Sequence, residues 1–429
     1  MKKSRSFELP STSRFSTFWL MLGAFLCYTG MYAVRKSFLA GQYAEVDFYG
    51  FDFKTILVIS QVLGYMLSKF LGIKLVSEMK REKRSQFLFG LVSFGLAMLL
   101  MFAFLPMNLK PIALFFNGLP LGIVFGLVFS YLEGRKNTEL LAAALSATFI
   151  FSTGFVKSVG LWLMQLTGVG EFIMPFLTAL LFFPVFLMAI KMLNKAQVRT
   201  QEDLELRSER VPMDRKQRFD FLKKHGLVFL GLVVIYVLLT VVRDFRDNFM
   251  VEFWAELGAE GKPELITLTE IPVAIIVLII AAVGFLIQDN KKAFKWGIYL
   301  CMSCCITIVL ITWLFEAAII SPIWWMIING IGLYLPYILF HCMIFERFLA
   351  LLKFKGNVGF LFYTADALGY TGSVGILLFK EFSNSQVTWV NFLGDLNQVA
   401  GIVMLLVCII TLGLLQRKTK LATELAINS

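Results

Sequence analysis

Apolar stretches of about 20 residues recur along this chain of 429 residues, and they restrict its possible folds more than any other feature. Each stretch can cross a hydrocarbon core about 30 Å thick. Only 16% of the residues are charged, against about a quarter in soluble domains. Because backbone amides in lipid must be hydrogen-bonded within their own segment, the stretches are predicted to be helices of an integral membrane protein.

Twelve such spans are predicted, six in each half of the chain. Those of the first half cover residues 16–40, 54–77, 86–105, 110–132, 139–166 and 171–193. Those of the second half cover 226–250, 265–288, 293–315, 321–345, 356–380 and 391–415. The polar segment 194–225 is predicted to be a cytoplasmic linker between an N-terminal bundle (1–193) and a C-terminal bundle (226–429).

Short sequence motifs relate the two halves. Three motifs of the first half recur in the same order in the second: Val34-Arg35 as Val242-Arg243, Asn117-Gly118 as Asn329-Gly330, and Gly-x-x-x-Ser-Val-Gly of 154–160 at 369–375. Their common order indicates that one half was built from the other. Six spans per unit is an even number, so both units cross the membrane in the same sense. A parallel repeat of this kind is typical of transporters with a site between the halves.

The loops between the predicted spans alternate in charge. One set is basic and carries Lys80, Arg81, Lys83, Arg84, Arg135, Lys136, Lys291, Lys292, Lys295, Arg347, Lys353 and Lys355. The other set is acidic and carries Glu45, Asp47, Asp52, Glu171, Glu252, Glu256, Glu260 and Glu264. Lysine and arginine favour the cytoplasmic side, which predicts cytoplasmic termini and a place in the plasma membrane, the inner membrane of a bacterium. The net charge of +11 then reflects topology, and cations scattered over many loops do not indicate nucleic-acid binding.

No nucleophile–base pair, nucleotide loop or metal site is recognisable in the sequence. Cys301, Cys304 and Cys305 share a helix face but have no histidine or acid nearby, and they are interpreted as packing residues. We therefore expect no enzymatic activity, no cofactor and no metal. The expected partners are the lipid bilayer and a small solute, and the chain is expected to act as a monomer.

Ionisable residues inside the predicted spans carry the functional signal, since a charge at mid-helix costs roughly 2.5–3.5 kcal/mol. They are Arg35, Lys36, Lys69, Lys157, Arg243, Asp244, Arg246, Asp247, Glu270, His341 and Asp366. The first half contributes cations without an acid at comparable depth, which predicts a cavity for an anion. Arginine suits a phosphate because its planar guanidinium can donate two parallel hydrogen bonds.

Several of these residues have structural alternatives. Lys36 and Arg246 lie near predicted helix ends, where long side chains can reach the headgroups. Arg243 and Asp247 are four residues apart and could form a local ion pair. The sequence alone supports this ion pair as well as it supports a ligand role for Arg243.

The remaining candidates are open to alternatives as well. Lys69 could neutralise Asp366 or Glu270 across a helix interface, and Glu270 could mark the outer end of its span. His341 on an apolar helix is more often a packing residue than a proton carrier. Asp366 lacks an obvious partner in its own helix, and a lone buried carboxylate is costly.

Arg35 is the strongest ligand candidate. It has no acidic neighbour in its own helix, and Tyr28 and Tyr32 precede it on roughly the same side. Together with Gly23 and the run Val-Arg-Lys-Ser-Phe at 34–38, these residues resemble the first helix of the organophosphate:phosphate antiporters. This family of the major facilitator superfamily includes the glycerol phosphate and hexose phosphate transporters.

Further motifs extend the resemblance over nearly the whole chain. Ser-Lys-Phe at 68–70 is similar to the family's second helix, Tyr334-x-Pro336 to its tenth, and the motif beginning Gly369-Tyr370 to its eleventh. Arg243 is placed like the family's second phosphate-binding arginine. The chain departs from the superfamily in the loop after the second helix, where the usual Gly-x-x-x-Asp-Arg is replaced, and the family's fifth-helix histidine is absent.

The resemblance implies two pseudo-symmetric six-helix bundles that transport an organophosphate or carboxylate-like anion by alternating access. Arg35 and Arg243 are expected to clamp the anion from opposite bundles, Lys157 to add charge, and Tyr28, Tyr32 and Tyr370 to bond or stack. Lys69, Asp247, Glu270, His341 and Asp366 are expected to balance charge or to couple ions. Two alternatives stay open: a proton-coupled symporter or exporter that uses Asp366 or Glu270, and a membrane sensor or scaffold that does not transport.

Overall fold

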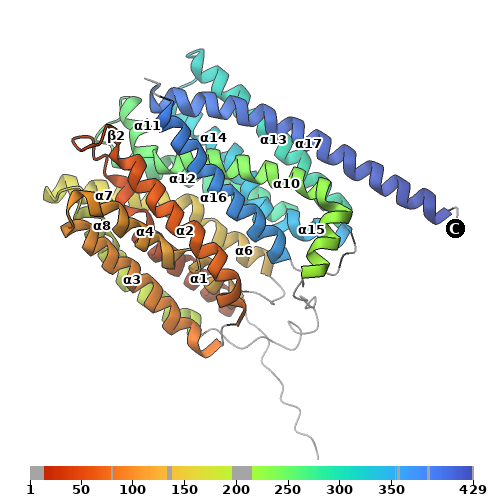
Figure 1. The fold of residues 1–429 in the computed structure, drawn as a ribbon, viewed down its shortest axis with the longest axis horizontal. Helices are drawn as coiled ribbons and strands as arrows, with labels where there is room; N and C mark the ends of the chain where they lie inside the picture. The colour runs from red at the N-terminus through yellow and green to blue at the C-terminus, as the bar shows by residue number, and fades with distance from the viewer. Residues whose placement is uncertain are drawn as a thin grey trace, which may run out of the picture.

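The computed structural model describes residues 14–78, 81–132, 138–195, 215–352, 354, 358–383 and 387–427. Nearly all of these residues are helical, and the long helices run roughly alongside one another (Figure 1). Helices of the first half lie together on one side, and those of the second half lie together on the other. The terms first half and second half below mean residues 14–195 and 215–427.

The first half contains eight α-helices: α1 (Arg14–Lys36), α2 (Phe53–Glu78), α3 (Arg84–Phe104), α4 (Lys110–Leu121), α5 (Val124–Leu132), α6 (Thr138–Ser146), α7 (Thr148–Thr167) and α8 (Met174–Asn194). Short 3₁₀ turns join some of them: η1 (Ser37–Ala40), η2 (Arg81–Lys83) and η3 (Met107–Leu109). The fourth predicted span is divided between α4 and α5, and the fifth between α6 and α7.

The second half contains α10 (Arg215–Asn248), α11 (Met250–Glu256), α12 (Pro263–Phe285), α13 (Asn290–Glu316), α14 (Pro322–Leu339), α15 (Phe345–Leu351), α16 (Val358–Phe382) and α17 (Trp389–Ile427). The π-helical turn η4 (Phe340–Ile344) continues α14 into α15. The predicted linker 194–225 is shorter than expected, because residues from Arg215 onward already belong to α10. Residues 196–214 of the linker lie outside the described residues.

Eleven helical stretches of the described chain are long and apolar enough to cross a membrane. They coincide with eleven of the predicted spans. The other predicted span, 356–380, corresponds to α16, which has 25 residues but includes Asp366 and several glycine, threonine and tyrosine residues. The predicted fold class, an all-α membrane protein, is confirmed.

The two halves pack their helices in the same pattern. In the first half α1 packs on α7 and α8, and α2 packs on α4. In the second half α10 packs on α16 and α17, and α12 packs on α14. The helices α1, α2, α4, α7 and α8 then correspond in order to α10, α12, α14, α16 and α17. With this correspondence, each of these contacts in the first half has a counterpart in the second.

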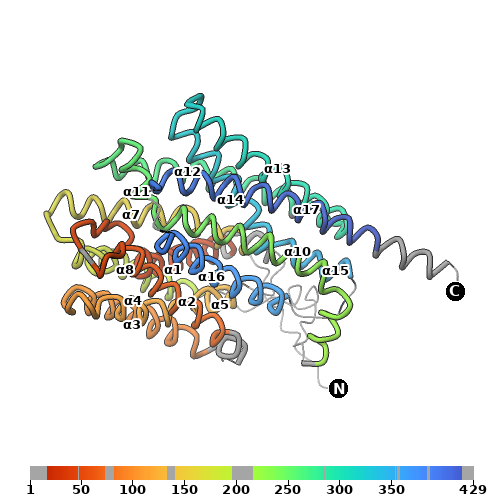
Figure 2. Tube along the Cα trace, turned by 45° about the horizontal axis from the view of Figure 1, so that its top comes forward, coloured from red at the N-terminus to blue at the C-terminus, as the bar shows by residue number. Residues whose placement is uncertain are grey.

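The contacts between the halves obey the same equivalence. α2 packs on α16, and α7 packs on α12, so exchanging the halves turns one contact into the other. Figure 2 shows α2 beside α16, where the two groups of helices meet. The interface therefore has the pseudo-twofold character expected for a parallel repeat.

A small hairpin marks one end of the molecule. β1 (Asp47–Phe48) pairs antiparallel with β2 (Phe51–Asp52). Tyr49 and Gly50 join them with positive φ angles of 57° and 79°, as a two-residue type I′ turn requires. The side chain of Asp52 then accepts hydrogen bonds from the backbone and the hydroxyl of Thr55, at 2.7 and 2.6 Å, and so caps the start of α2.

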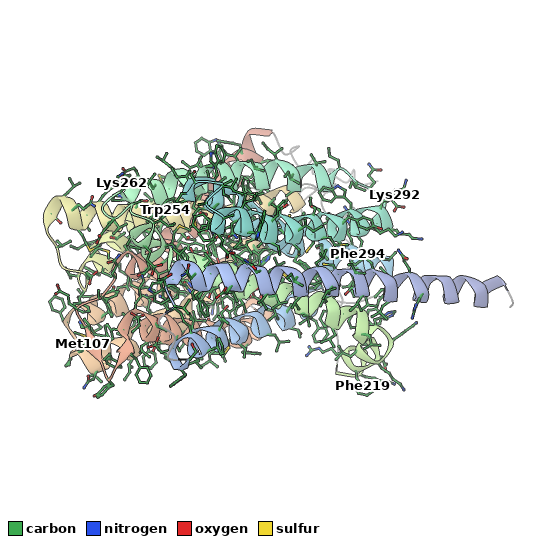
Figure 3. All side chains as sticks on the ribbon, turned by 90° about the horizontal axis from the view of Figure 1, so that it is seen from above. Met107, Phe219, Trp254, Lys262, Lys292 and Phe294 are labelled. Carbon is green, nitrogen blue, oxygen red and sulfur yellow. The ribbon has the colours of Figure 1, made fainter. Side chains whose placement is uncertain are left out.

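The two ends of the helix array carry the two predicted loop sets. Figure 3 shows Met107, Trp254 and Lys262 toward one end and Phe219, Lys292 and Phe294 toward the other. The first end holds loops predicted to face outward, and the second holds loops predicted to be cytoplasmic. We call them the outer end and the inner end. The orientation itself, with cytoplasmic termini, stays a prediction.

Candidate anion-binding site

Charged side chains are buried where the two halves meet, and the buried acids of the described residues all belong to the second half. The first half contributes the buried cations Arg35, Lys36, Lys54, Lys69 and Lys157. The second half contributes the buried acids Asp244, Asp247, Glu252, Glu270 and Asp366, together with Arg243 and Arg246. Four of the buried ion pairs cross the interface, and in each a lysine of the first half meets an acid of the second: Lys36–Asp247, Lys54–Glu252, Lys69–Asp366 and Lys157–Asp247.

Asp247 of α10 is the centre of the largest of these clusters. One carboxylate oxygen lies 2.9 Å from Nζ of Lys36, and the other lies 2.7 Å from Nζ of Lys157. Lys157 also donates to the Asp247 backbone carbonyl, and the Thr153 hydroxyl donates to the Asp247 carboxylate. Lys36 donates to Asn248 at 2.7 Å as well. A single carboxylate of the second half thus holds α1 and α7 of the first half.

This cluster changes two interpretations made from the sequence. Lys36 does not extend to the headgroups, because it is 2% exposed and turned toward Asp247. Asp247 makes its close ionic contacts with Lys36 and Lys157, whereas the carboxylate near Arg243 is that of Asp244, at 3.7 Å. Lys157, expected to add charge for the substrate, is engaged by Asp247 in this conformation.

Further contacts join the halves toward the outer end. Lys54 at the start of α2 donates to the Glu252 carboxylate in α11, and to the Leu39 carbonyl at 2.9 Å. The Asp52 backbone amide donates to Glu381 of α16 at 2.7 Å. Burial raises the pKa of the Glu252 carboxyl above its ordinary value, although Lys54 opposes this shift. The outer side of the interface is therefore closed by polar contacts.

Arg35 lies at the point where α1 gives way to the 3₁₀ turn η1. The helix end frees the carbonyls of Val34 and Arg35, and two buried amides satisfy them. Gln61 donates to the Arg35 carbonyl at 2.6 Å, and Asn117 donates to the Val34 carbonyl at 3.1 Å. Gln61 also donates to Asn117 at 2.7 Å, so the two amides form one network. This network fixes the backbone that carries the Arg35 side chain.

The Arg35 guanidinium is buried among tyrosines. Its Cζ atom lies 3.5 Å from the ring centroid of Tyr65 in α2 and 6.0 Å from that of Tyr370 in α16. Its Nε and Nη2 atoms find no hydrogen-bond partner among the described residues. The side chain is 2% exposed, so it points into the protein and not toward lipid.

Arg243 of α10 is placed in a similar way in the second half. Its Cζ atom lies 4.2 Å from the ring centroid of Tyr337 in α14. Its Nε and Nη2 atoms also lack a hydrogen-bond partner among the residues described. The Tyr337 ring lies 6.0 Å from that of Phe149, which in turn lies 6.4 Å from the Tyr32 ring, so aromatic contacts connect the surroundings of the two arginines.

The tyrosines predicted to accompany Arg35 are buried in the same region. The rings of Tyr28 and Tyr32 lie 5.1 Å apart, edge to face. Tyr32 interacts electrostatically with both Arg35 and Arg243. Tyr28 contacts Tyr32 and faces the inner side of the site, where its ring meets Phe125 and Phe149.

Asp366 has the partners that its own helix does not provide. Its carboxylate lies 3.1 Å from Nζ of Lys69 and accepts a hydrogen bond of 2.9 Å from Tyr236. The Lys69 ammonium also lies 5.1 Å from the ring centroid of Tyr65, the ring that Arg35 covers. Of the two acids that Lys69 was expected to neutralise as an alternative role, Asp366 is therefore the one that it contacts.

Glu270 and His341 lie beside the site and not between the arginines. Arg246 donates to Glu270 at 2.6 Å and to the Met326 carbonyl at 3.0 Å, all within the second half. Glu270 and Arg246 are 1% and 0% exposed, so Arg246 does not extend to the headgroups. His341 lies in η4, with Nδ1 3.1 Å from the Tyr337 carbonyl and its ring against Phe149 and Phe362.

Sequence reasoning did not select Gln61, Tyr65, Tyr236 or Tyr337. A spacing rule would have found some of them. Gln61 and Tyr65 precede Lys69 by eight and four residues, which places all three on one face of α2. Tyr236 precedes Arg243 by seven residues on α10, again two helical turns away on the same face.

The sequence matches the model of a protein family of unknown function, DUF5690, over residues 37–418. The chain belongs to this family. Arg35 and the tyrosines before it precede the matched segment. Among curated proteins, no sequence matches this member of DUF5690.

Solved transporter structures share the architecture. A mutant of the nucleoside transporter NupG superposes with a TM-score of 0.60, over 92% of this chain and 99% of that one, at 10% identity. A D-xylose-proton symporter superposes with a TM-score of 0.55, over 91% and 97% of the two chains, at 15% identity. At these identities the likeness shows the fold alone, which is the major facilitator fold implied by the sequence.

Proposed function

We propose that this protein is a secondary active transporter that moves a small anion with a phosphate or carboxylate group across a membrane. The observation that supports this proposal is a pair of buried arginines, one from each half, with unbonded guanidinium nitrogens. Arg35 and Arg243 each retain Nε and Nη2 without a hydrogen-bond partner in the described chain. Buried donors are normally bonded, and leaving a charged donor unbonded is expensive.

The balance of charge at the interface supports an anion as the missing partner. Apart from Lys110, which donates to carbonyls at the end of α3, the described chain buries seven cations and five acids, a surplus of two positive charges. Lys54, Lys69 and Arg246 each have an acid of their own. Asp247 pairs with two lysines, which leaves one excess positive charge there. Asp244 lies 3.7 Å from Arg243, and no ion pair of Arg35 is found among the described residues, which leaves the second. A dianion such as a phosphate or phosphate monoester would neutralise both.

The interface suggests how binding is coupled to transport. The outer end is closed by ion pairs that join the halves, while the arginines lie between those pairs and Lys69–Asp366 on the inner side. An anion that bridges Arg35 and Arg243 binds both halves at once. It therefore favours the arrangement in which the halves are close, and this differential affinity drives the change of access.

The two structurally similar transporters suggest the competing solutes for a test. Purified full-length protein is heated with inorganic phosphate, a sugar phosphate, a dicarboxylate, D-xylose or a nucleoside. The anions are expected to raise the melting temperature, and the neutral sugar and nucleoside are not. Stabilisation by a neutral solute alone would contradict the proposal.

Arg35→Lys tests the site itself. The substitution keeps the charge but removes the planar pair of donors, so anion affinity should fall by about ten- to a hundredfold. Arg417→Lys, at an exposed position of α17, is the matched control and should leave affinity unchanged. Equal affinity in Arg35→Lys and wild type would remove Arg35 from the site.

Proton coupling and a sensor role stay as alternatives with their own test. Protein reconstituted into vesicles should accumulate or exchange labelled phosphate if it transports. Uptake that requires an inward proton gradient, and loses this requirement in Asp366→Asn, would favour proton coupling. Binding without any flux would favour a sensor. The cytoplasmic orientation of both termini and action as a monomer are part of the same proposal.

A further inference from the structure

Lys69 lies close to the proposed anion site but is held by an acid of the opposite half. Its ammonium and the Arg35 guanidinium share the ring of Tyr65, at 5.1 and 3.5 Å from the centroid. Arg243 lies over the ring of Tyr337, and that ring stacks at 5.4 Å on Tyr236, which donates to Asp366. Aromatic contacts therefore connect the Lys69–Asp366 pair with the surroundings of both arginines.

The contact between Lys69 and Asp366 engages only one carboxylate oxygen. Nζ of Lys69 lies 3.1 Å from the Oδ2 atom of Asp366. The other oxygen, Oδ1, accepts from Tyr236 at 2.9 Å. Tyr236 therefore holds the carboxylate on the second half while the Lys69 ammonium remains on an aromatic surface, 5.7 Å from the Phe125 centroid. An anion bound at Arg35 would offer this ammonium a second anionic partner.

We propose that Asp366 is an internal competitor of the transported anion, and that Lys69 is a third cationic ligand that the anion takes from it. This inference rests on the proposed function and adds a residue and a coupling step to it. When the site is empty, Lys69 binds Asp366 and joins α2 to α16. When an anion binds Arg35, Lys69 turns across Tyr65 to the anion, and this link between the halves on the inner side is released.

The proposal predicts that removing one buried acid increases the affinity for the anion. Removing a ligand normally weakens binding, but Asp366→Asn should strengthen it, because Lys69 no longer has a competing acid. Affinity for inorganic phosphate is expected to rise by about tenfold, whereas Lys69→Gln should lower it by a similar factor. The rate of phosphate exchange in vesicles should fall in Asp366→Asn, because the tighter complex releases its anion more slowly.

A double-mutant cycle separates this mechanism from a general effect of charge. In Lys69→Gln/Asp366→Asn, the affinity for inorganic phosphate should equal that of Lys69→Gln alone, since the gain acts through Lys69. Glu270→Gln is the matched control: it removes another buried acid, one bound by Arg246, and should not change affinity. A gain that persists without Lys69, or no gain in Asp366→Asn, would overturn the proposal.

The cycle remains decisive if Asp366→Asn does not fold. Leaving Lys69 buried without a partner is costly, but both variants that lack the lysine avoid that state. Comparison of Lys69→Gln with the double variant then tests the proposal, because a purely electrostatic effect makes the double variant bind more tightly. If wild type binds no phosphate, the proposed function fails for that anion. If it binds but the cycle shows no dependence on Lys69, only the present inference fails.

Discussion

The two halves of this protein have the same helix packing but opposite chemistry at the surface they share. The first half presents lysines to the interface, and the second presents aspartates and glutamates. Equivalent helices make equivalent contacts, yet the four crossing ion pairs named above all run in one direction, from a lysine of the first half to an acid of the second. After duplication, a scaffold needs only the packing to stay alike, and the charges are free to diverge into complementary sets.

Arg35 and Arg243 are the exception, because both halves retain an arginine at corresponding motifs. If the anion is clamped from both sides, Arg243→Lys should weaken phosphate binding about as much as Arg35→Lys does, by roughly ten- to a hundredfold. Isothermal titration of the two purified variants is the measurement. A loss confined to Arg35→Lys would mean that the site belongs to the first half, and that Arg243 only balances Asp244.

Substitution of Asp247 tests whether the opposite charges of the two halves stabilise their interface. Asp247→Asn leaves Lys36 and Lys157 buried without a full counter-charge, which should destabilise the closed outer end by about 3–5 kcal/mol. The expected readout is a markedly lower melting temperature in detergent. Glu264→Gln, an exposed acid at the start of α12, is the control. An unchanged melting temperature in Asp247→Asn would show that the lysines are satisfied by other groups.

The two asparagines of the repeated Asn-Gly motif differ in their bonding. Asn117 donates to the carbonyls of Val34 and Gly95 and accepts from Gln61. Both side-chain polar atoms of Asn329 are buried without a hydrogen-bond partner in the described chain.

Asn117→Ala should therefore cost about 1–3 kcal/mol, whereas Asn329→Ala should be close to neutral. Thermal unfolding of both variants measures the difference. Equal destabilisation would indicate that the halves use the motif in the same way.

A smaller effect than that of Asp247→Asn is expected at the outer end. Lys54 keeps its bond to the Leu39 carbonyl when Glu252 is changed, and the Glu252 side chain is 10% exposed. Glu252→Gln should therefore lower stability less than Asp247→Asn, because only one lysine loses its counter-charge. Its expected consequence is easier labelling of a cysteine introduced near Lys54 from the outer side. Labelling that stays as slow as in the parent cysteine variant would exclude this pair from the closure of the outer end.

Much of the fold could be predicted because it depends on length and composition. Apolar runs long enough for the membrane must be helical, and this requirement does not depend on what surrounds them. One boundary differs at the start of α10, which begins at Arg215, before the predicted span 226–250. The fourth predicted span has the observed ends, but it is divided between α4 and α5. In these places hydrophobicity does not report the backbone conformation.

The sequence indicated charged residues that the structure buries, but not how they pair. Arg35 was chosen because it has no acid nearby in its own helix, and the structure leaves its guanidinium partly unbonded. Lys157 looked equally free, but its carboxylate partner is 90 residues away in the chain. Asp247 looked like a partner of Arg243 because the two are one turn apart, yet it faces α1 and α7.

The sequence by itself determined that this chain spans a membrane with two related sets of helices, and that cations and acids are buried in it. Those properties follow from local composition and from order along the chain. The tertiary structure decided which cation meets which acid, because that depends on how each helix is rotated and how closely the halves approach. Lys36 and Lys157 are therefore bound to Asp247, while Arg35 and Arg243 keep buried donors that an anion can satisfy.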